Sequence, residues 1–193
     1  MGRTAPETAQ QDDVRLGTLN IRTTPDEAQV LMFVGRGPAI ARQLPTGMAY
    51  ELVAIAEGRA PSRAVVPADA SWESTFDGPR YELAMQVSEE PMPVDALVLG
   101  ATRLLPDQLG VPSDELGTIR VVTNPPGAKV YLLVGFTPNA TVSNLRIDEP
   151  IEFLVFREGY VLERMTVAPN DWTVDERGRS VAAIDVELRR TLE

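Results

Sequence analysis

Residues 117–135 read GTIRVVTNPPGAKVYLLVG, and residues 17–35 carry a second version of this stretch, GTLNIRTTPDEAQVLMFVG. The two versions align without a gap at a separation of 100 residues, so that glycines, a turn proline and alternating aliphatic residues coincide. Apolar residues alternate with polar ones on both sides of a proline-containing turn, which is typical of a β-hairpin. The chain is therefore predicted to consist of two copies of one module.

The fold class follows from what surrounds the two hairpins. Short alternating segments separated by Gly, Pro, Asn and Asp continue to residue 87 in the first copy and to residue 190 in the second. Such closely spaced turns are typical of small antiparallel β-sandwiches. We therefore expect an all-β protein with two tandem β-sandwich modules, residues 16–87 and 117–190.

The remaining segments are a lead-in, residues 1–15, and a linker, residues 88–116. The lead-in is polar and acidic, and we expect it to be flexible. In the linker, Asp95 is a suitable helix N-cap, and the leucines that follow it lie at helical spacing, whereas Gly100 also fits a strand that ends there. A short helix is favoured over a strand. In either case we expect the linker leucines to be buried against the modules: Leu97, Leu104, Leu105 and Leu109.

Composition restricts the partners that the protein could bind. The 193 residues carry a net charge of −10, whereas nucleic-acid binding requires a basic surface. The same acidity disfavours anionic membrane surfaces, and no apolar run is long enough to insert into a bilayer. We therefore expect no nucleic-acid partner and no membrane insertion of this segment.

Composition also restricts the chemistry. The sequence contains no cysteine and no histidine, which excludes thiolate metal sites, cysteine nucleophiles and the usual general base of serine hydrolases. Adjacent carboxylates are scattered along the chain, and neighbours in a strand point to opposite faces, so these pairs make poor acid–base dyads. We expect no catalytic residues, no bound metal and no cofactor. A calcium site in the acidic loop of residues 170–176 is a weaker alternative.

At these residues the chain resembles the PEGA domain family. The second copy carries the pattern best, in the segment TNPPGA at residues 123–128, in Thr137-Pro138 and in the EGY at residues 158–160. The first copy departs from it, because Glu27 replaces the turn glycine and Gly37-Pro38 replaces Thr-Pro. The resemblance implies all-β modules of bacterial envelope and extracytoplasmic proteins, which have a binding or spacer role and no catalytic residues.

Two tryptophans are the candidate ligand-binding residues. Trp72 and Trp172 lie 100 residues apart, each in the loop before the last strand of its module. A tryptophan at such a place either closes the open end of a thin sandwich or offers a platform on which a sugar ring or a partner's side chain stacks. We expect Trp172 to be mostly buried and Trp72 to be the more exposed.

Together with what the resemblance to PEGA domains implies, these observations predict a non-catalytic, extracytoplasmic interaction module that binds an envelope glycan or a partner protein. A cytoplasmic location stays open, because the first residues lack the apolar core of a signal peptide. The alternatives are a mechanical spacer, the sensor region of a larger receptor kinase, and a glycan-active enzyme that uses scattered carboxylates.

Overall fold

The hairpin prediction for the repeated stretch is wrong, although each copy forms two strands on either side of its turn. In the computed structural model, which describes residues 15–192, the first copy forms β1 (Leu16–Thr24) and β2 (Gln29–Arg36). The second copy forms β8 (Leu116–Asn124) and β9 (Lys129–Phe136). The two strands of each copy belong to different sheets and do not pair with each other, because both edges of each strand are paired with other strands. We call residues 16–36 the first arm and residues 116–136 the second arm. Every second residue of β1 and β8 is buried, as the alternation of apolar and polar residues predicts. Apart from Arg15, the predicted lead-in lies outside the described residues.

The rest of each repeat adds strands in the same order. The first repeat continues with β3 (Ala39–Pro45), β4 (Tyr50–Ile55), β5 (Ser62–Val66), β6 (Glu73–Thr75) and β7 (Gly78–Gln86). The second continues with β10 (Ala140–Arg146), β11 (Ile151–Phe156), β12 (Glu163–Val167), β13 (Thr173–Val174) and β14 (Ser180–Glu187). The described helical turns are short 3₁₀ segments: η1 (Val94–Ala96), η2 (Pro106–Gln108) and η3 (Pro169–Asp171). The all-β fold class is confirmed.

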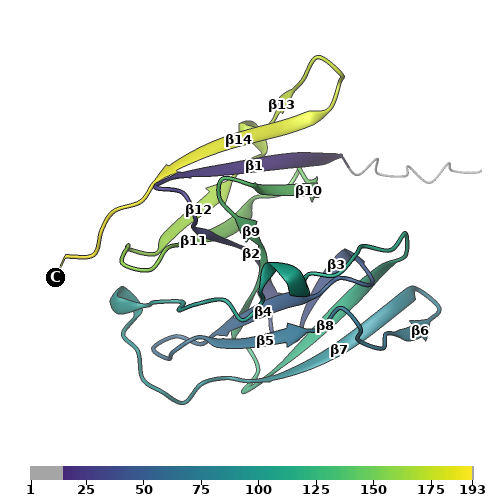
Figure 1. Ribbon diagram of the computed structural model, residues 1–193, viewed down its shortest axis with the longest axis horizontal. Coiled ribbons are helices and arrows are strands. Elements are labelled where there is room, and N and C mark those ends of the chain that lie inside the picture. Colours follow the sequence, from purple (N-terminus) through teal and green to yellow (C-terminus); the bar gives the residue numbers. More distant parts are fainter. Residues whose placement is uncertain (1–14, 193) are drawn as a thin grey trace, which may run out of the picture.

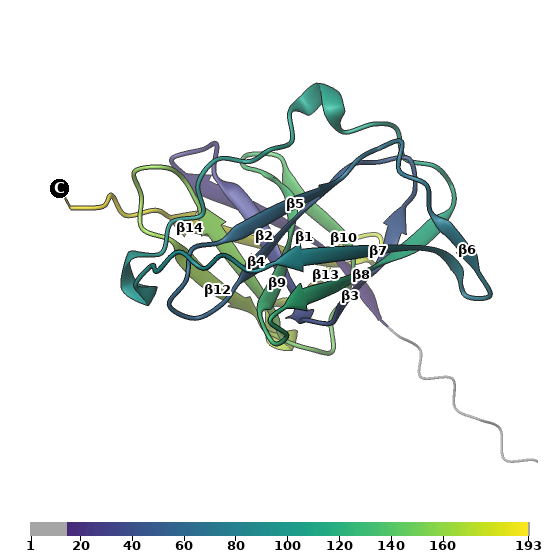
Figure 2. The same ribbon diagram turned by 90° about the horizontal axis from the view of Figure 1, so that it is seen from below.

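The strands of residues 15–192 form three sheets (Figure 1). Sheet A has the order β10-β1-β14-β13, and sheet C has the order β3-β8-β7-β6. Sheet B is six-stranded, with the order β12-β11-β2-β9-β4-β5. Figure 2 shows β7, β8 and β3 of sheet C side by side.

The strand pairing differs from the prediction of two self-contained tandem sandwiches. Strand β1 of the first repeat lies between β10 and β14 of the second, and β8 of the second lies between β3 and β7 of the first. The two repeats therefore exchange their arms, and the predicted antiparallel arrangement is incomplete, because β1 runs parallel to β14 and β8 runs parallel to β7. The exchange is possible because the arms share one apolar pattern, so that each fits the complementary surface of either repeat.

Sheet B joins the two halves through strands of the exchanged arms. Strands β2 and β9 pair at its centre, with Met32 opposite Leu132, one hundred positions later. The register is symmetric about this pair, since Gln29 pairs with Phe136 and Arg36 pairs with Lys129. The two halves are thus related by a pseudo-two-fold axis that passes through the middle of sheet B.

Two apolar cores lie on one face of sheet B. The core under sheet C combines residues of β3, β4, β5 and β7 with Ile119, Val121, Val130 and Leu132 of the second arm. The core under sheet A combines residues of β10, β11, β12 and β14 with Leu19, Ile21 and Val30 of the first arm. Each arm therefore completes the core of the other repeat.

The linker covers the opposite face of sheet B in an extended path. Leu97 and Leu99 are buried there beside Leu31, Val53 and Tyr131. The favoured short helix is wrong: residues 97–105 are outside any helix, and Gly100 has a φ of 71° in the left-handed region. Prolines before and after this segment also break a helical path.

Burial of the linker leucines is confirmed for half of the predicted residues. Leu97 and Leu104 are buried, whereas Leu105 and Leu109 are 57% and 41% exposed. The latter two flank η2, which follows the segment that packs on sheet B. The linker is therefore docked along part of its length.

Candidate functional site

The two tryptophans occupy equivalent places in the two halves. Each is half-buried and packs against the apolar core of its half. A Cβ atom added to Gly117 would lie 2.7 Å from Cζ3 of Trp72, and one added to Gly17 would lie 2.6 Å from Cζ3 of Trp172. Each indole therefore covers the glycine at the start of the arm that comes from the other repeat.

This placement favours a packing role for both rings. The indole Nε1 atoms of Trp72 and Trp172 are buried without a hydrogen-bond partner in the described chain, although a buried indole N–H usually has one. The structure does not bring the two side chains together, because one belongs to the core under sheet C and the other to the core under sheet A. Ligand binding by their part-exposed surfaces stays a prediction.

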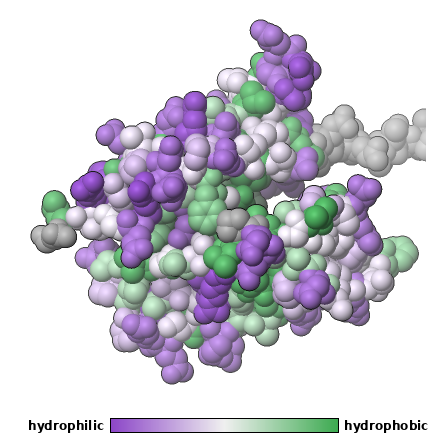
Figure 3. All heavy atoms as spheres, viewed as in Figure 1, coloured by the Kyte–Doolittle hydropathy of each residue, from purple (hydrophilic) through white to green (hydrophobic). Residues whose placement is uncertain are grey.

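A groove lies on the pseudo-two-fold axis between sheets A and C. It has a volume of about 630 Å³, and strands β3 and β10 line it on opposite sides. Equivalent residues of the two repeats line it together: Met32 and Leu132, which are paired in sheet B, and, from the edge strands, Gln43 and Asn144, and Leu44 and Leu145. In Figure 3 the surface is hollowed between the parts of the molecule that carry these two sheets, with hydrophobic residues beside the hollow.

Both edge strands are irregular where they line this axial groove. The register of β3 against β8 shifts between Ala41 and Leu44, and Gln43 has a φ of 61°. Strand β10 repeats this geometry, since Asn144 also has a φ of 61° within a register shift against β1. Bulges at sheet edges redirect side chains and interrupt the regular ladder that strand addition needs.

The lining of the axial groove is mostly aliphatic. The linker adds three leucines to the groove wall, two of them exposed, and Phe136 at the rim is 43% exposed. The polar side chains are few, and they come mainly from the two bulges. Concave apolar surfaces with a few polar groups of this kind are the usual binding sites of proteins.

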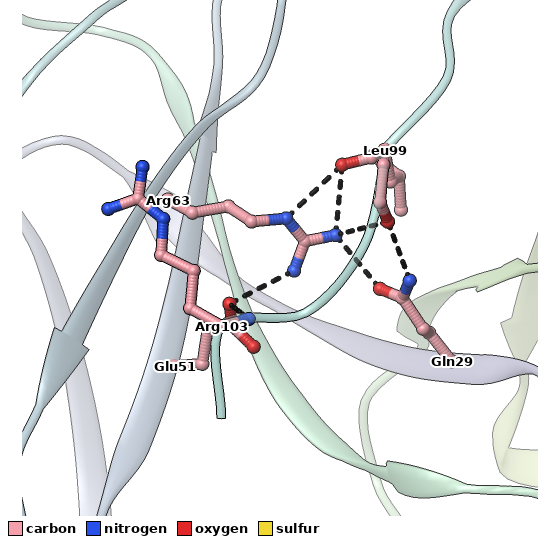
Figure 4. A network of polar contacts seen from close by, with 6 residues as sticks. Gln29, Glu51, Arg63, Leu99 and Arg103 are labelled. Atoms are coloured by element: carbon pink, nitrogen blue, oxygen red, sulfur yellow. Dashed lines mark hydrogen bonds and ion pairs between the residues drawn. The ribbon is translucent and has the colours of Figure 1, made fainter. Parts of the chain in front are cut away.

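A polar cluster on the other face of sheet B fixes the linker. We call it the first clasp, and it consists of Gln29, Glu51 and Arg63 (Figure 4). Arg63 forms an ion pair with Glu51 at 3.4 Å, and their side chains are 6% and 0% exposed. The Nε and Nη2 atoms of Arg63 both donate to the carbonyl oxygen of Leu99, at 3.1 and 3.0 Å.

The linker completes the first clasp with its backbone. Gln29 donates from Nε2 to the carbonyl oxygen of Gly100 at 2.7 Å, and the backbone N–H of Arg103 donates to Oε1 of Glu51 at 2.7 Å. Desolvation by burial lowers the pKa of Arg63, and Glu51 partly offsets this effect. A buried pair of this kind requires its partners to remain in place, because loss of one leaves an uncompensated charge.

The first clasp was not singled out from the sequence, although a signal for it exists. Glu51 and Arg63 recur as Glu152 and Arg164, 101 residues later in each case. A charged residue at the same point of two otherwise apolar strands is a repeated exception to the burial pattern, and such exceptions mark buried polar networks.

The acidic side chains do not gather into a metal site within residues 15–192. No group of three or more Asp, Glu, His or Cys residues there has the geometry to hold a metal ion. In the predicted calcium loop, the carboxylate of Asp175 binds Arg179, and hydrogen bonds from Arg179 hold the pKa of Asp175 below its usual value. None of the described helical segments is long and apolar enough to cross a membrane.

Comparison with known proteins adds no identity to these observations. The chain matches no protein-family model, no curated protein and no solved structure. The resemblance to the PEGA family and the role it implies therefore stay predictions.

Proposed function

We propose that the protein is a non-catalytic interaction module that binds apolar side chains of a partner protein in the axial groove. The observation that carries this proposal is the aliphatic hollow between two bulged edge strands. Its volume lies within the range of about 300–1,000 Å³ that is typical of binding pockets. The exposed Leu105, Leu109 and Phe136 give a partner apolar surface to cover.

A protein partner fits this groove better than a glycan. Sugars stack on exposed aromatic rings, whereas most residues that line the groove are aliphatic and only Tyr50 and Phe136 among them are aromatic. The tryptophans that would offer such platforms pack on Gly17 and Gly117 instead. A glycan ligand, if one exists, would use the part-exposed rings of Trp72 and Trp172.

The resemblance to PEGA domains supports two further parts of the proposal. We infer that the repeats are PEGA-like β-sandwich units, modified by the exchange of arms, and that the protein works outside the cytoplasm. A mechanical spacer is the second candidate function. It is favoured by the exchanged arms, which join the halves by strand pairing on both sides of the axis.

Site-specific crosslinking tests the proposed function. A photo-crosslinking amino acid at position 105, at the groove, and another at position 76, whose phenylalanine is fully exposed outside it, would be compared in extracts of the source organism. A protein captured only from position 105 would then be purified and titrated against the wild type, Leu105→Glu and Phe76→Glu.

Weaker binding by Leu105→Glu alone supports the proposal. Equal capture from both positions, or equal binding by both variants, contradicts it. A glycan array with the same three proteins, and with Trp72→Ala, examines the carbohydrate alternative. Turnover of any envelope glycan by the wild type would contradict the non-catalytic assignment.

A further inference from the structure

The second repeat contains a counterpart of the first clasp. We call it the second clasp, and it consists of Lys129, Glu152 and Arg164, which stand where the first repeat has Gln29, Glu51 and Arg63. Arg164 donates from Nη1 to Oε1 of Glu152 at 3.1 Å, just as Nη1 of Arg63 faces Oε1 of Glu51. The two clasps therefore share the same core ion pair.

The two clasps differ in what covers them. The linker backbone lies over the first clasp, and the ion-pair side chains there are 6% and 0% exposed. In the second clasp, the side chains of Arg164 and Glu152 are 44% and 25% exposed. The second clasp is thus the uncovered version of a site that binds an extended segment elsewhere in the same molecule.

Arg164 retains the donors that Arg63 uses to hold that segment. In the first clasp, Nε and Nη2 of Arg63 donate to the carbonyl oxygen of Leu99. In the second, the hydrogen bonds of Arg164 within the described chain, to Glu152 and to the hydroxyl of Tyr131, both come from Nη1. The paired Nε–Nη2 edge is therefore available to an oxygen ligand from outside.

The exchange of Gln29 for Lys129 changes the ligand that the site prefers. Gln29 is neutral and donates to the carbonyl oxygen of Gly100. Lys129 brings a positive charge, and its Nζ atom lies 3.9 Å from Oε2 of Glu152, at the limit of an ion pair. An ammonium group beside a free guanidinium edge binds a carboxylate more strongly than a neutral carbonyl group.

The second clasp faces a cavity of about 500 Å³. This basic cavity is lined by four cationic side chains and by a single carboxylate, that of Glu57. The whole chain, by contrast, carries a net charge of −10. The cations are Arg36, Arg59, Lys129 and Arg164. Met92, Val94 and Leu97 of the linker form an apolar wall beside them. The cavity thus combines an anion site with a surface for apolar side chains.

We propose that the basic cavity binds an extended, acidic peptide of a partner protein, with one carboxylate held by Arg164 and Lys129 and neighbouring apolar side chains on the linker wall. The peptide repeats in the second half the interaction that the linker makes in the first. This site lies on the opposite face of sheet B from the axial groove and does not depend on binding there.

The test uses fluorescent peptides and the full chain. The acidic probe is acetyl-Leu-Val-Leu-Glu-Ala-amide, which follows the linker sequence LVLGA of residues 97–101 with a carboxylate at the glycine position. The matched neutral probe has glutamine in place of that glutamate. Sodium acetate and phosphate serve as competitors, to distinguish a peptide site from a site for small anions.

Anisotropy titrations would compare the wild type with four variants. Arg164→Gln removes the paired Nε and Nη2 donors, whereas Arg164→Lys keeps the positive charge but lacks the paired donors. Lys129→Gln introduces the glutamine that the first clasp has at this position. Arg177→Gln is the control, because Arg177 is an exposed cation outside the basic cavity. Thermal unfolding of each variant identifies any loss of folding.

We expect the acidic probe to bind the wild type and Arg164→Gln to weaken it by about tenfold, as for loss of a charge-assisted hydrogen bond. Lys129→Gln should remove the preference for glutamate over glutamine, Arg164→Lys should be intermediate, and Arg177→Gln should bind as the wild type does. The proposal is overturned if the acidic probe does not bind, if Arg164→Gln binds it as tightly as the wild type does, or if Arg177→Gln weakens its binding. It is also overturned if acetate competes as well as the unlabelled peptide.

Discussion

Met32 and Leu132 are paired with each other at the centre of sheet B, so that each residue lies opposite its own counterpart in the other repeat. Since the register on both sides of this pair is symmetric, the two repeats meet as the two chains of a symmetric dimer would. The symmetry is broken in a few places, and these provide the sharpest tests of the structure.

The turn of the first arm breaks the symmetry in sequence, because it has Glu27 where the second arm has Gly127. Glu27 has a φ of 66° and Gly127 has a φ of 95°, so both residues lie in the left-handed region. A left-handed φ costs a residue with a Cβ atom about 1 kcal/mol or more, whereas glycine adopts it freely. Glu27→Gly should therefore raise the free energy of unfolding by about 1 kcal/mol, measured by urea denaturation.

The reciprocal change is the control for this turn. Gly127→Ala places a Cβ atom at the same point of the second arm. No neighbour lies within 4 Å of that Cβ atom, so the change in stability reports the cost of the backbone conformation alone. It should lower stability by a similar amount. A neutral or destabilising Glu27→Gly would mean that the carboxylate makes a compensating interaction.

A second break in symmetry concerns two threonines. Thr137 shares a hydrogen bond of 2.6 Å with Thr23, and its hydroxyl accepts from the N–H of Ala28. The first repeat has Gly37 in place of Thr137, and the buried hydroxyl of Thr123 there has no partner. Gly37→Thr should supply that partner and stabilise the protein by about 1 kcal/mol.

The Gly37→Thr variant requires Thr123 to rotate, because a Cβ atom at position 37 would lie 2.1 Å from its Oγ1 atom. The second repeat shows that the same backbone accommodates the pair. Thr137→Gly is the matched control and should destabilise the protein. If both variants are destabilising, the two sites are not equivalent in packing.

The contact between each tryptophan and its glycine predicts a coupling between the repeats. Gly117→Ala forces a methyl group against the ring of Trp72 and should cost about 1–3 kcal/mol by overpacking. Trp72→Ala should cost about 3–5 kcal/mol, because it empties the end of the core. The double variant should cost less than the sum, which a double-mutant cycle measures.

Gly17→Ala and Trp172→Ala form the equivalent cycle in the other half. Additive costs in either cycle would mean that the indole does not rest on the glycine. Intact stability of Trp72→Ala would instead favour the platform interpretation of that ring.

Alkaline pH should weaken the fold through two tyrosines. Burial raises the pKa of Tyr50 to about 12, and burial together with Glu152 raises that of Tyr131 to about 12, from an ordinary value of 10.0. The unfolded chain then loses these protons first, so their contribution is complete below pH 10 and is lost as the pH rises to about 12.

Urea titrations between pH 9 and pH 12 would test this, with the pH range set by those two pKa values. The free energy of unfolding should fall with increasing pH, and Tyr50→Phe and Tyr131→Phe should each reduce the slope. An unchanged slope in the double variant would show that other groups cause the alkaline loss.

The sequence predicted the strands but could not predict their partners. The alternation of Leu19 and Ile21 is the same as that of Ile119 and Val121, so the apolar residues of either arm would fit either core. Exchange depends on the length and path of the connections rather than on local pattern. Helical spacing in the linker was misleading, because packing of Leu97 and Leu99 on sheet B decides its conformation.

The candidate sites could be predicted only in part from the sequence, because they too depend on which strands pair. The axial groove and the basic cavity both combine residues of the two repeats with residues of the linker, and these meet only after the exchange. The two tryptophans were identifiable from their spacing, but the glycines beneath them belong to the opposite repeat.

The exchange of arms also nests one core inside the other along the chain. The buried residues of the core under sheet C lie between Ala39 and Leu132, whereas those of the core under sheet A come from strands before residue 37 and after residue 139. A ribosome therefore synthesises all buried residues of the inner core before the second half of the outer core, and the first arm waits for the end of the chain. Met32 and Val34 of the first arm also pack against the inner core, so the waiting arm has a surface to rest on before its own core is complete.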